Sequence, residues 1–224
     1  MIPALIFAAG AGFLVLLLWQ RYRRLARERY IRQFALPRGL YERLRKRRPE
    51  LELKDCALVA RGLRQFFLAY LNSGCRFVAM PSQAVDDLWH EFILYTRAYE
   101  AFCGKAFGGF LHHTPAVVLS QDKRNNEGLR RVWWQCCKEE NIDPRSPVRL
   151  PLLFAIDAKL GIADGFVYKP DCKALQGSDA GTAHCGADFS DSSIDGGTDG
   201  FADGGADGGG DGGGCGGGCG GGGD

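Results

Sequence analysis

The feature that most constrains this chain is an uncharged apolar run near residue 1. From Ile2 to Trp19 nearly every residue is Ala, Gly, Leu, Ile, Val or Phe. Eighteen helical residues extend about 27 Å, close to the roughly 30 Å hydrocarbon core of a bilayer. Trp19 stands where an interfacial aromatic belongs, and arginines begin at Arg21. The run therefore predicts a transmembrane anchor over residues 1–20.

The arginines also predict an orientation. Because cationic residues gather on the cytoplasmic side of a span, we expect a single-pass membrane protein with its N-terminus outside and its remaining chain cytoplasmic. A cleaved signal peptide is the main alternative, but such peptides carry positive charge before the apolar run and small residues after it. Here the order is reversed, with Trp19-Gln20-Arg21 after the run. A buried core helix fits less well, since such helices usually have a polar face.

Charge is divided unevenly along the chain. Residues 21–48 hold twelve Lys and Arg against two Glu, whereas residues 177–224 hold nine Asp and no Lys or Arg. A basic neck at residues 21–35, next to an anchor, predicts contact with anionic lipid headgroups. Nucleic-acid binding is the other interpretation of a basic run. Because this run lies beside the anchor, we expect no nucleic-acid partner. A salt-sensitive contact between the neck and the acidic tail is a further alternative.

Helical spacing of apolar residues predicts an all-α domain over residues 36–173. We expect helices near residues 37–48, 53–71, 82–103 (with Ser82 as N-cap), 126–140 and 150–160. The chain shows no convincing series of strands. Its nine cysteines are odd in number and irregularly spaced, which favours reduced thiols over a disulfide framework.

Residues 174–224 form a low-complexity tail rich in Gly and Asp. Asp recurs at every fourth position from Asp191 to Asp211, but glycine costs about 1 kcal/mol per residue in a helix. With almost nothing apolar to bury, the tail is expected to be disordered. The aspartates then keep the glycine-rich segment soluble. Cys215 and Cys219, together with His184-Cys185, are an alternative Cys₃His zinc set.

The densest group of chemically capable residues lies between positions 86 and 113. The candidate functional cluster comprises Asp86, Trp89, His90, Tyr99, Cys103, His112 and His113. Asp86 precedes His90 by one helical turn, and a carboxylate at that spacing orients an imidazole and raises its basicity. If the chain after Gly104 folds back, one of the two adjacent histidines, His112 or His113, reaches His90.

Two His with Asp or Cys form a ligand set suited to zinc or iron. The candidate metal ligands are therefore His90, His112 and His113. The alternatives are a local Asp–His ion pair, a turn hydrogen-bonded by the His pair, and a contact with a partner.

The segment from Trp89 to Cys103 resembles the glycine-rich domain-containing protein-like family. Plant members read Trp-His-x-His, then Leu, Pro, Tyr and Asp-Cys at matching offsets. The positions shared with this chain are Trp89, His90, Leu94, Tyr99 and Cys103, with Asp86 upstream. The chain departs at Phe92, Thr96 and Phe102, where that pattern has His, Pro and Asp. The resemblance implies a helical domain coupled to a glycine-rich extension, and the lost second His argues against a metal site built on this helix alone.

Two functions follow from these observations. We expect the helical domain to act as an interaction or scaffold module with a protein partner. The alternative is a metal-dependent enzyme or metal-binding domain centred on His90 and His112 or His113. Other catalytic motifs fail: the chain has no Gly-x-Ser-x-Gly elbow and no phosphate-binding loop, and a zincin helix beginning at His90 would need His where Leu94 stands.

Overall fold

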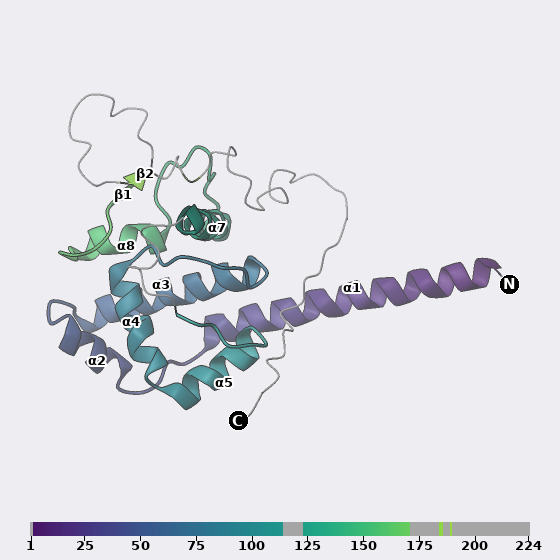
Figure 1. Ribbon diagram of the computed structural model, residues 1–224, viewed down its shortest axis with the longest axis horizontal. Coiled ribbons are helices and arrows are strands. Elements are labelled where there is room, and N and C mark those ends of the chain that lie inside the picture. The colour runs from purple at the N-terminus through teal and green to yellow at the C-terminus, as the bar shows by residue number, and fades with distance from the viewer. Residues whose placement is uncertain (1, 114–122, 171–183, 186–188, 190–224) are drawn as a thin grey trace.

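The computed structural model describes residues 2–113, 123–170, 184–185 and 189, and this part of the chain is mainly helical (Figure 1). The helices are α1 (Ile2–Gln33), α2 (Leu40–Arg47), α3 (Leu53–Asn72), α4 (Gln83–Ile93), α5 (Thr96–Ala106), α7 (Lys123–Glu139) and α8 (Leu152–Leu160). Two short strands, β1 (Tyr168–Lys169) and β2 (His184–Cys185), pair in parallel. The helical domain expected from the apolar spacing is therefore confirmed.

Helix α3 is the centre of the domain, in contact with α1, α2, α4, α7 and α8. Its apolar face is fully buried, as at Val59, Leu63 and Phe66. Gly62 permits the close approach of α4, because a Cβ atom there would stand 2.9 Å from Val85 Cγ2. Helix α4, which carries Asp86 and His90, thus packs directly on the central helix α3.

One expected helix, residues 82–103, is two helices in the structure. The helix breaks at Leu94 and Tyr95, and Tyr95 leaves the helical region with φ −83° and ψ 58°. The break turns α5 so that Phe102 and Tyr99 both pack on Phe92, with ring centroids 5.5 and 5.2 Å apart. Burial of these rings stabilises the bend, which a continuous helical pattern in the sequence does not reveal.

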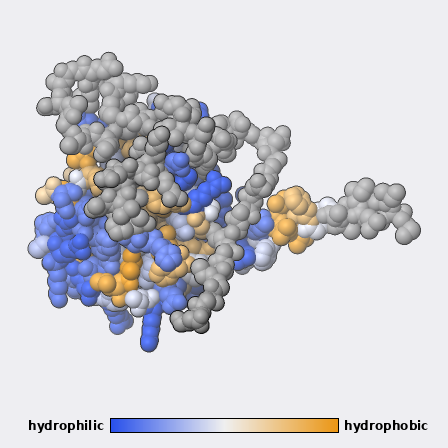
Figure 2. Space-filling model, in the orientation of Figure 1, coloured by the Kyte–Doolittle hydropathy of each residue, from blue (hydrophilic) through white to orange (hydrophobic). Residues whose placement is uncertain are grey.

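The predicted transmembrane anchor is wrong for the residues that the structure describes. Helix α1 projects from the domain, and its exposed side chains from Phe13 to Trp19 form an apolar patch (Figures 1 and 2). Among the described residues no helix is long and apolar enough to cross a membrane. The predicted single-pass membrane location, with the N-terminus outside and the domain cytoplasmic, is therefore not supported.

The second half of α1 is part of the domain rather than a separate basic neck. Ile31 is fully buried, and Arg32 pairs with Glu139 of α7 at 2.6 Å. Arg24 also donates to the side chain of Asn72 at the end of α3. The arginines that suggested a lipid-facing neck therefore lie partly against the helical domain.

Packing on the domain continues after residue 173. Phe189 is buried against Trp133 and Phe154, with ring centroids 5.9 Å apart in both cases. Its carbonyl accepts a hydrogen bond from Arg130 Nε at 3.2 Å. Apart from Phe189 and the two residues of β2, the expected tail, including the aspartate series, Cys215 and Cys219, lies outside the described part of the chain.

The cysteines whose state the structure describes are of two kinds. Free thiols are buried at Cys56, Cys103, Cys136 and Cys137. Burial raises the pKa of Cys137 to about 12, so this thiol stays protonated at neutral pH. Cys75 is disulfide-bonded, and the expectation of reduced thiols throughout the chain fails there.

Candidate metal centre

A buried carboxylate fixes the start of α4. Ser82 is the N-cap, as its sequence position predicts, and its Oγ accepts a hydrogen bond from the Val85 backbone at 3.2 Å. Asp157 of α8 then accepts hydrogen bonds from Ser82 Oγ and from the backbone of Gln83 and Ala84, at 2.7, 2.7 and 3.2 Å. Free backbone N–H groups at a helix N-terminus favour a nearby negative charge. Asp157 therefore sets the position of the helix that carries Asp86 and His90.

The adjacent carboxylates Asp86 and Asp87 face different neighbours. Asp87 is fully buried and pairs with Arg47 and Arg48 of the segment at the end of α2, at 2.8 and 2.7 Å. Arg48 also pairs with Asp164, and that hydrogen bond raises the pKa of Arg48. The ion pairs of Asp87 thus join the end of α2 to α4. Asp86 is therefore the carboxylate of the site.

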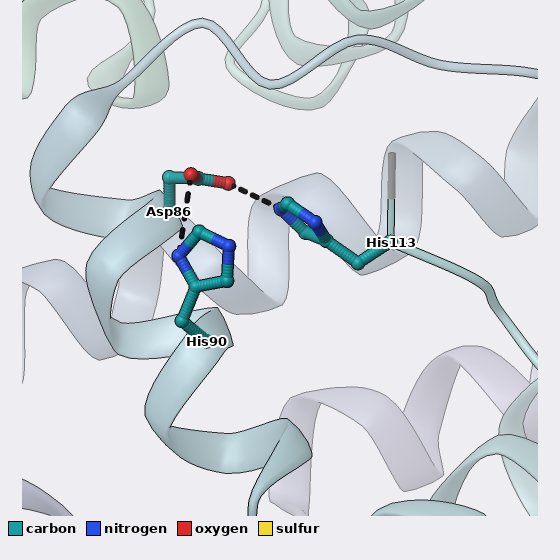
Figure 3. A group of neighbouring side chains, drawn as sticks. All are labelled: Asp86, His90 and His113. Carbon is teal, nitrogen blue, oxygen red and sulfur yellow. Dashed lines mark hydrogen bonds and ion pairs between the residues drawn. The ribbon is translucent and has the colours of Figure 1, made fainter. Parts of the chain in front are cut away.

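Asp86, His90 and His113 converge on one point (Figure 3). Asp86 and His90 come from α4, and His113 from the segment that returns after α5. Asp86 Oδ1 lies 2.9 Å from His113 Nε2, and Asp86 Oδ2 lies 3.5 Å from His90 Nδ1. One nitrogen or oxygen from each residue lies within 4.8 Å of the others. Both imidazoles are turned toward the carboxylate.

The electrostatics of His90 favour its neutral form. Burial lowers the pKa of His90 below the ordinary 6.5, and the charges of His113 and Arg47 lower it further, while Asp86 opposes them. The separation of 3.5 Å from Asp86 is within the range of an ion pair, yet the buried Nδ1 atom has no hydrogen-bond partner. His90 therefore presents a neutral, unpartnered nitrogen, the form in which imidazole binds a metal.

Trp89 and Tyr99 hold His113 in place. Trp89 Nε1 donates to Tyr99 Oη at 3.1 Å, and that hydroxyl donates to the Leu111 carbonyl at 2.6 Å. Burial raises the pKa of Tyr99, so the hydroxyl stays a donor. The Trp89 ring meets the His113 ring edge-on, with centroids 4.5 Å apart. The two aromatic residues of the motif thus position the histidine and are not themselves among the three converging groups.

Cys103 and His112 lie away from the three converging groups. Cys103 is buried beside Tyr99, and burial raises the pKa of its thiol although hydrogen bonds with Leu111 and Tyr99 oppose the shift. His112 is exposed and its ring lies against that of Phe110, with centroids 4.8 Å apart and the planes tilted by 56°. Among the described residues the structure therefore brings together two of the three histidines expected as ligands.

The three departures from the resembling family lie outside the site. Phe92 and Phe102 are buried in the aromatic core, with their own centroids 5.5 Å apart. Thr96 is the exposed first residue of α5. A histidine at position 92 would point into this core, away from the carboxylate. The second imidazole of the site instead comes from His113, on a different segment.

The match to a family model covers most of the domain. The chain belongs to the UCP032817-like family, whose model matches residues 26–189. The matched range begins within α1 and ends at Phe189, the last described residue packed on the helices. Searches of curated proteins and of solved structures gave no match. The family name specifies no activity.

Sequence reasoning missed the residues that support the site. Asp157, Arg48 and the Leu111 carbonyl carry no motif of their own. Asp157 interrupts the apolar run from Leu152 to Leu160. A lone carboxylate in a helix that is apolar apart from Lys159 is the one signal that marked it, since buried charges need partners.

Proposed function

We propose that this domain binds one divalent transition-metal ion, zinc or iron(II), through Asp86, His90 and His113. The observation that carries the proposal is the buried His90 Nδ1 atom, which has no hydrogen-bond partner and lies 3.5 Å from Asp86 Oδ2. Two ligands bound tetrahedrally at 2.0–2.1 Å stand about 3.4 Å apart. An ion between these two atoms would satisfy both.

The donor set supports the same assignment. Two imidazoles and one carboxylate are the ligands of hydrolytic zinc centres and of non-haem iron(II) centres. Three protein ligands leave a coordination position for water or a substrate oxygen. The side chain of His90 is 37% exposed, whereas those of Asp86 and His113 are 12% and 11% exposed, so solvent reaches the group from the His90 side. A metal there would activate a bound water or polarise a substrate oxygen.

Metal analysis of the full chain tests this proposal. The protein is purified under reducing, chelator-free conditions, and its zinc and iron are measured before and after dialysis against each ion. We expect about one ion per chain in the wild type and loss of that ion in His90→Ala. The proposal fails if wild type and His90→Ala both hold no stoichiometric metal.

A closer relation to the glycine-rich domain-containing protein-like family is also a proposal. It is supported by the part that Trp89, His90 and Tyr99 play at one site. The expectation of an interaction or scaffold module with a protein partner stays a prediction, and pull-down with the full chain would test it.

A further inference from the structure

A cavity of about 650 Å³ lies apart from the candidate metal centre. It is lined by parts of α1, α3, α7 and α8 and by the segment before α8. Its volume falls within the roughly 300–1,000 Å³ of typical small-molecule sites. None of the three converging residues, Asp86, His90 and His113, lines it.

The lining of this cavity has an excess of positive charge. Five cationic side chains line it, against the carboxylates of Glu139 and Glu140. Those carboxylates are already engaged: Glu139 pairs with Arg32, and Glu140 pairs with Arg149. Glu140 also accepts hydrogen bonds from Gln65 and from the Leu152 backbone, at 2.9 and 2.6 Å. The remaining cations are Arg61, Arg64 and Lys159.

These three cations have no carboxylate partner among the residues that the structure describes. Arg64 is held by the carbonyls of Ala60 and Phe34, at 3.2 and 3.0 Å. Its Nε–H is buried and has no acceptor. A buried guanidinium donor without a partner is costly, and the same guanidinium belongs to a residue that lines the cavity.

The face of α3 in this cavity carries both apolar and cationic residues. Leu58, Arg61, Arg64 and Leu68 recur at intervals of three and four, so they share one side of the helix. Arg61 and Arg64 are neighbours at i and i+3, where like charges repel. Leu150 and Leu152 add apolar surface from the opposite side. The pattern fits a ligand that has both an anionic group and an apolar body.

We infer that this cavity binds a small molecule in which a phosphate group is attached to an apolar body. Arginine recognises phosphate oxygens through two parallel N–H donors, and lysine adds a point charge. Arg61, Arg64 and Lys159 hold the phosphate, and the leucines of the cavity contact the apolar body. The inference is independent of the metal centre.

Calorimetric titration of the full chain with phenyl phosphate tests it. We expect saturable binding, weaker binding of inorganic phosphate, and no binding of benzyl alcohol, which lacks the charge. The variant Arg61→Gln/Lys159→Gln should weaken phenyl phosphate binding roughly tenfold or more. Both residues are exposed, so the substitutions leave the core intact.

The matched control is Arg76→Gln/Arg97→Gln, which removes the same charge from two exposed residues outside the cavity. This control should bind phenyl phosphate as the wild type does. Equal weakening in both double variants, or absence of saturable binding in the wild type, overturns the inference. Binding to vesicles containing phosphatidate without binding of phenyl phosphate also overturns it, because the ligand would then be a lipid headgroup.

Discussion

His113 Nε2 lies 2.9 Å from Asp86 Oδ1, although 27 residues separate the two in the chain. The contact depends on the break between α4 and α5, which turns the chain back along α4. It also depends on the hydrogen bond from Tyr99 to the Leu111 carbonyl, two residues before His113. A metal centre assembled in this way has two ligands on a rigid helix and a third on an anchored loop.

The neighbouring histidines His112 and His113 provide a matched pair. His113→Asn removes a ligand, and we expect zinc affinity to fall by more than the 10–100-fold that loss of an outer-shell partner costs. His112→Asn changes an exposed ring outside the site and should leave zinc affinity within about threefold of wild type. Competition with a chelator of known affinity measures both. Equal losses in the two variants would contradict the assigned ligand set.

The carboxylates Asp86 and Asp87 should separate metal binding from stability. Asp87→Asn removes the partner of Arg47 and Arg48 at a fully buried position, and should lower the free energy of unfolding by about 2–4 kcal/mol. Asp86→Asn should abolish stoichiometric zinc binding and change the stability of the metal-free protein by about 1 kcal/mol or less.

Urea unfolding in the presence of a chelator and zinc analysis, performed on both Asp variants, check this pair. If Asp87→Asn loses zinc while keeping its stability, the division of roles between the two carboxylates is wrong.

Asp157 should act on the site only through the position of α4. Asp157→Ala leaves the Ser82 hydroxyl and the backbone donors of Gln83, Ala84 and Phe166 without their acceptor. We expect a loss of roughly 3 kcal/mol or more in the free energy of unfolding, together with weaker zinc binding. Asp157→Asn keeps the shape and one acceptor, so its loss should be smaller.

Asp143→Ala is the control for that series. Asp143 is exposed and accepts a local hydrogen bond from the Arg145 backbone. Its substitution should stay within about 0.5 kcal/mol, as is usual for surface positions. Urea unfolding measures the free energy of unfolding of the three variants. Equal stability of Asp157→Ala and Asp143→Ala would refute the capping role of Asp157.

Glu140 should make stability depend on pH in acid. Burial alone would raise its pKa, but hydrogen bonds from Leu152, Gln65 and Arg149 outweigh burial and lower the pKa below the ordinary 4.5. A carboxyl with a lowered folded pKa stabilises the protein above its unfolded pKa, and this stabilisation is lost as pH falls through the folded value. Glu140→Gln should therefore be less stable at pH 7 and lose less stability on acidification below about pH 4.5.

Urea unfolding from pH 7 to pH 3 measures the effect of Glu140. Glu50→Gln, at an exposed carboxylate 4.0 Å from Arg48, is the control and should stay within about 0.5 kcal/mol of wild type. Parallel pH profiles of wild type and Glu140→Gln would rule out the effect.

Much of the fold was predictable because it depends on local spacing. The apolar residues of α3 recur every three or four positions, and the Ser82 cap precedes its helix directly. The break at Leu94 and Tyr95 was not predictable, since it is stabilised by contacts between rings on different helices. The apolar run before Arg21 gave a wrong prediction of an anchor, since no helix among the described residues is long and apolar enough to cross a membrane. The run also does not show that α1 continues past it and buries Ile31 in the domain.

The sequence by itself determined that the domain is helical and that Asp86 and His90 share one helix, because both follow from the period of an α-helix. It also restricted the second imidazole to His112 or His113. Only the tertiary structure decided between them: His113 faces Asp86, and His112 is exposed. The choice of His113 and the different partners of Asp86 and Asp87 both depend on polar contacts between segments far apart in the chain. Local spacing does not encode such contacts.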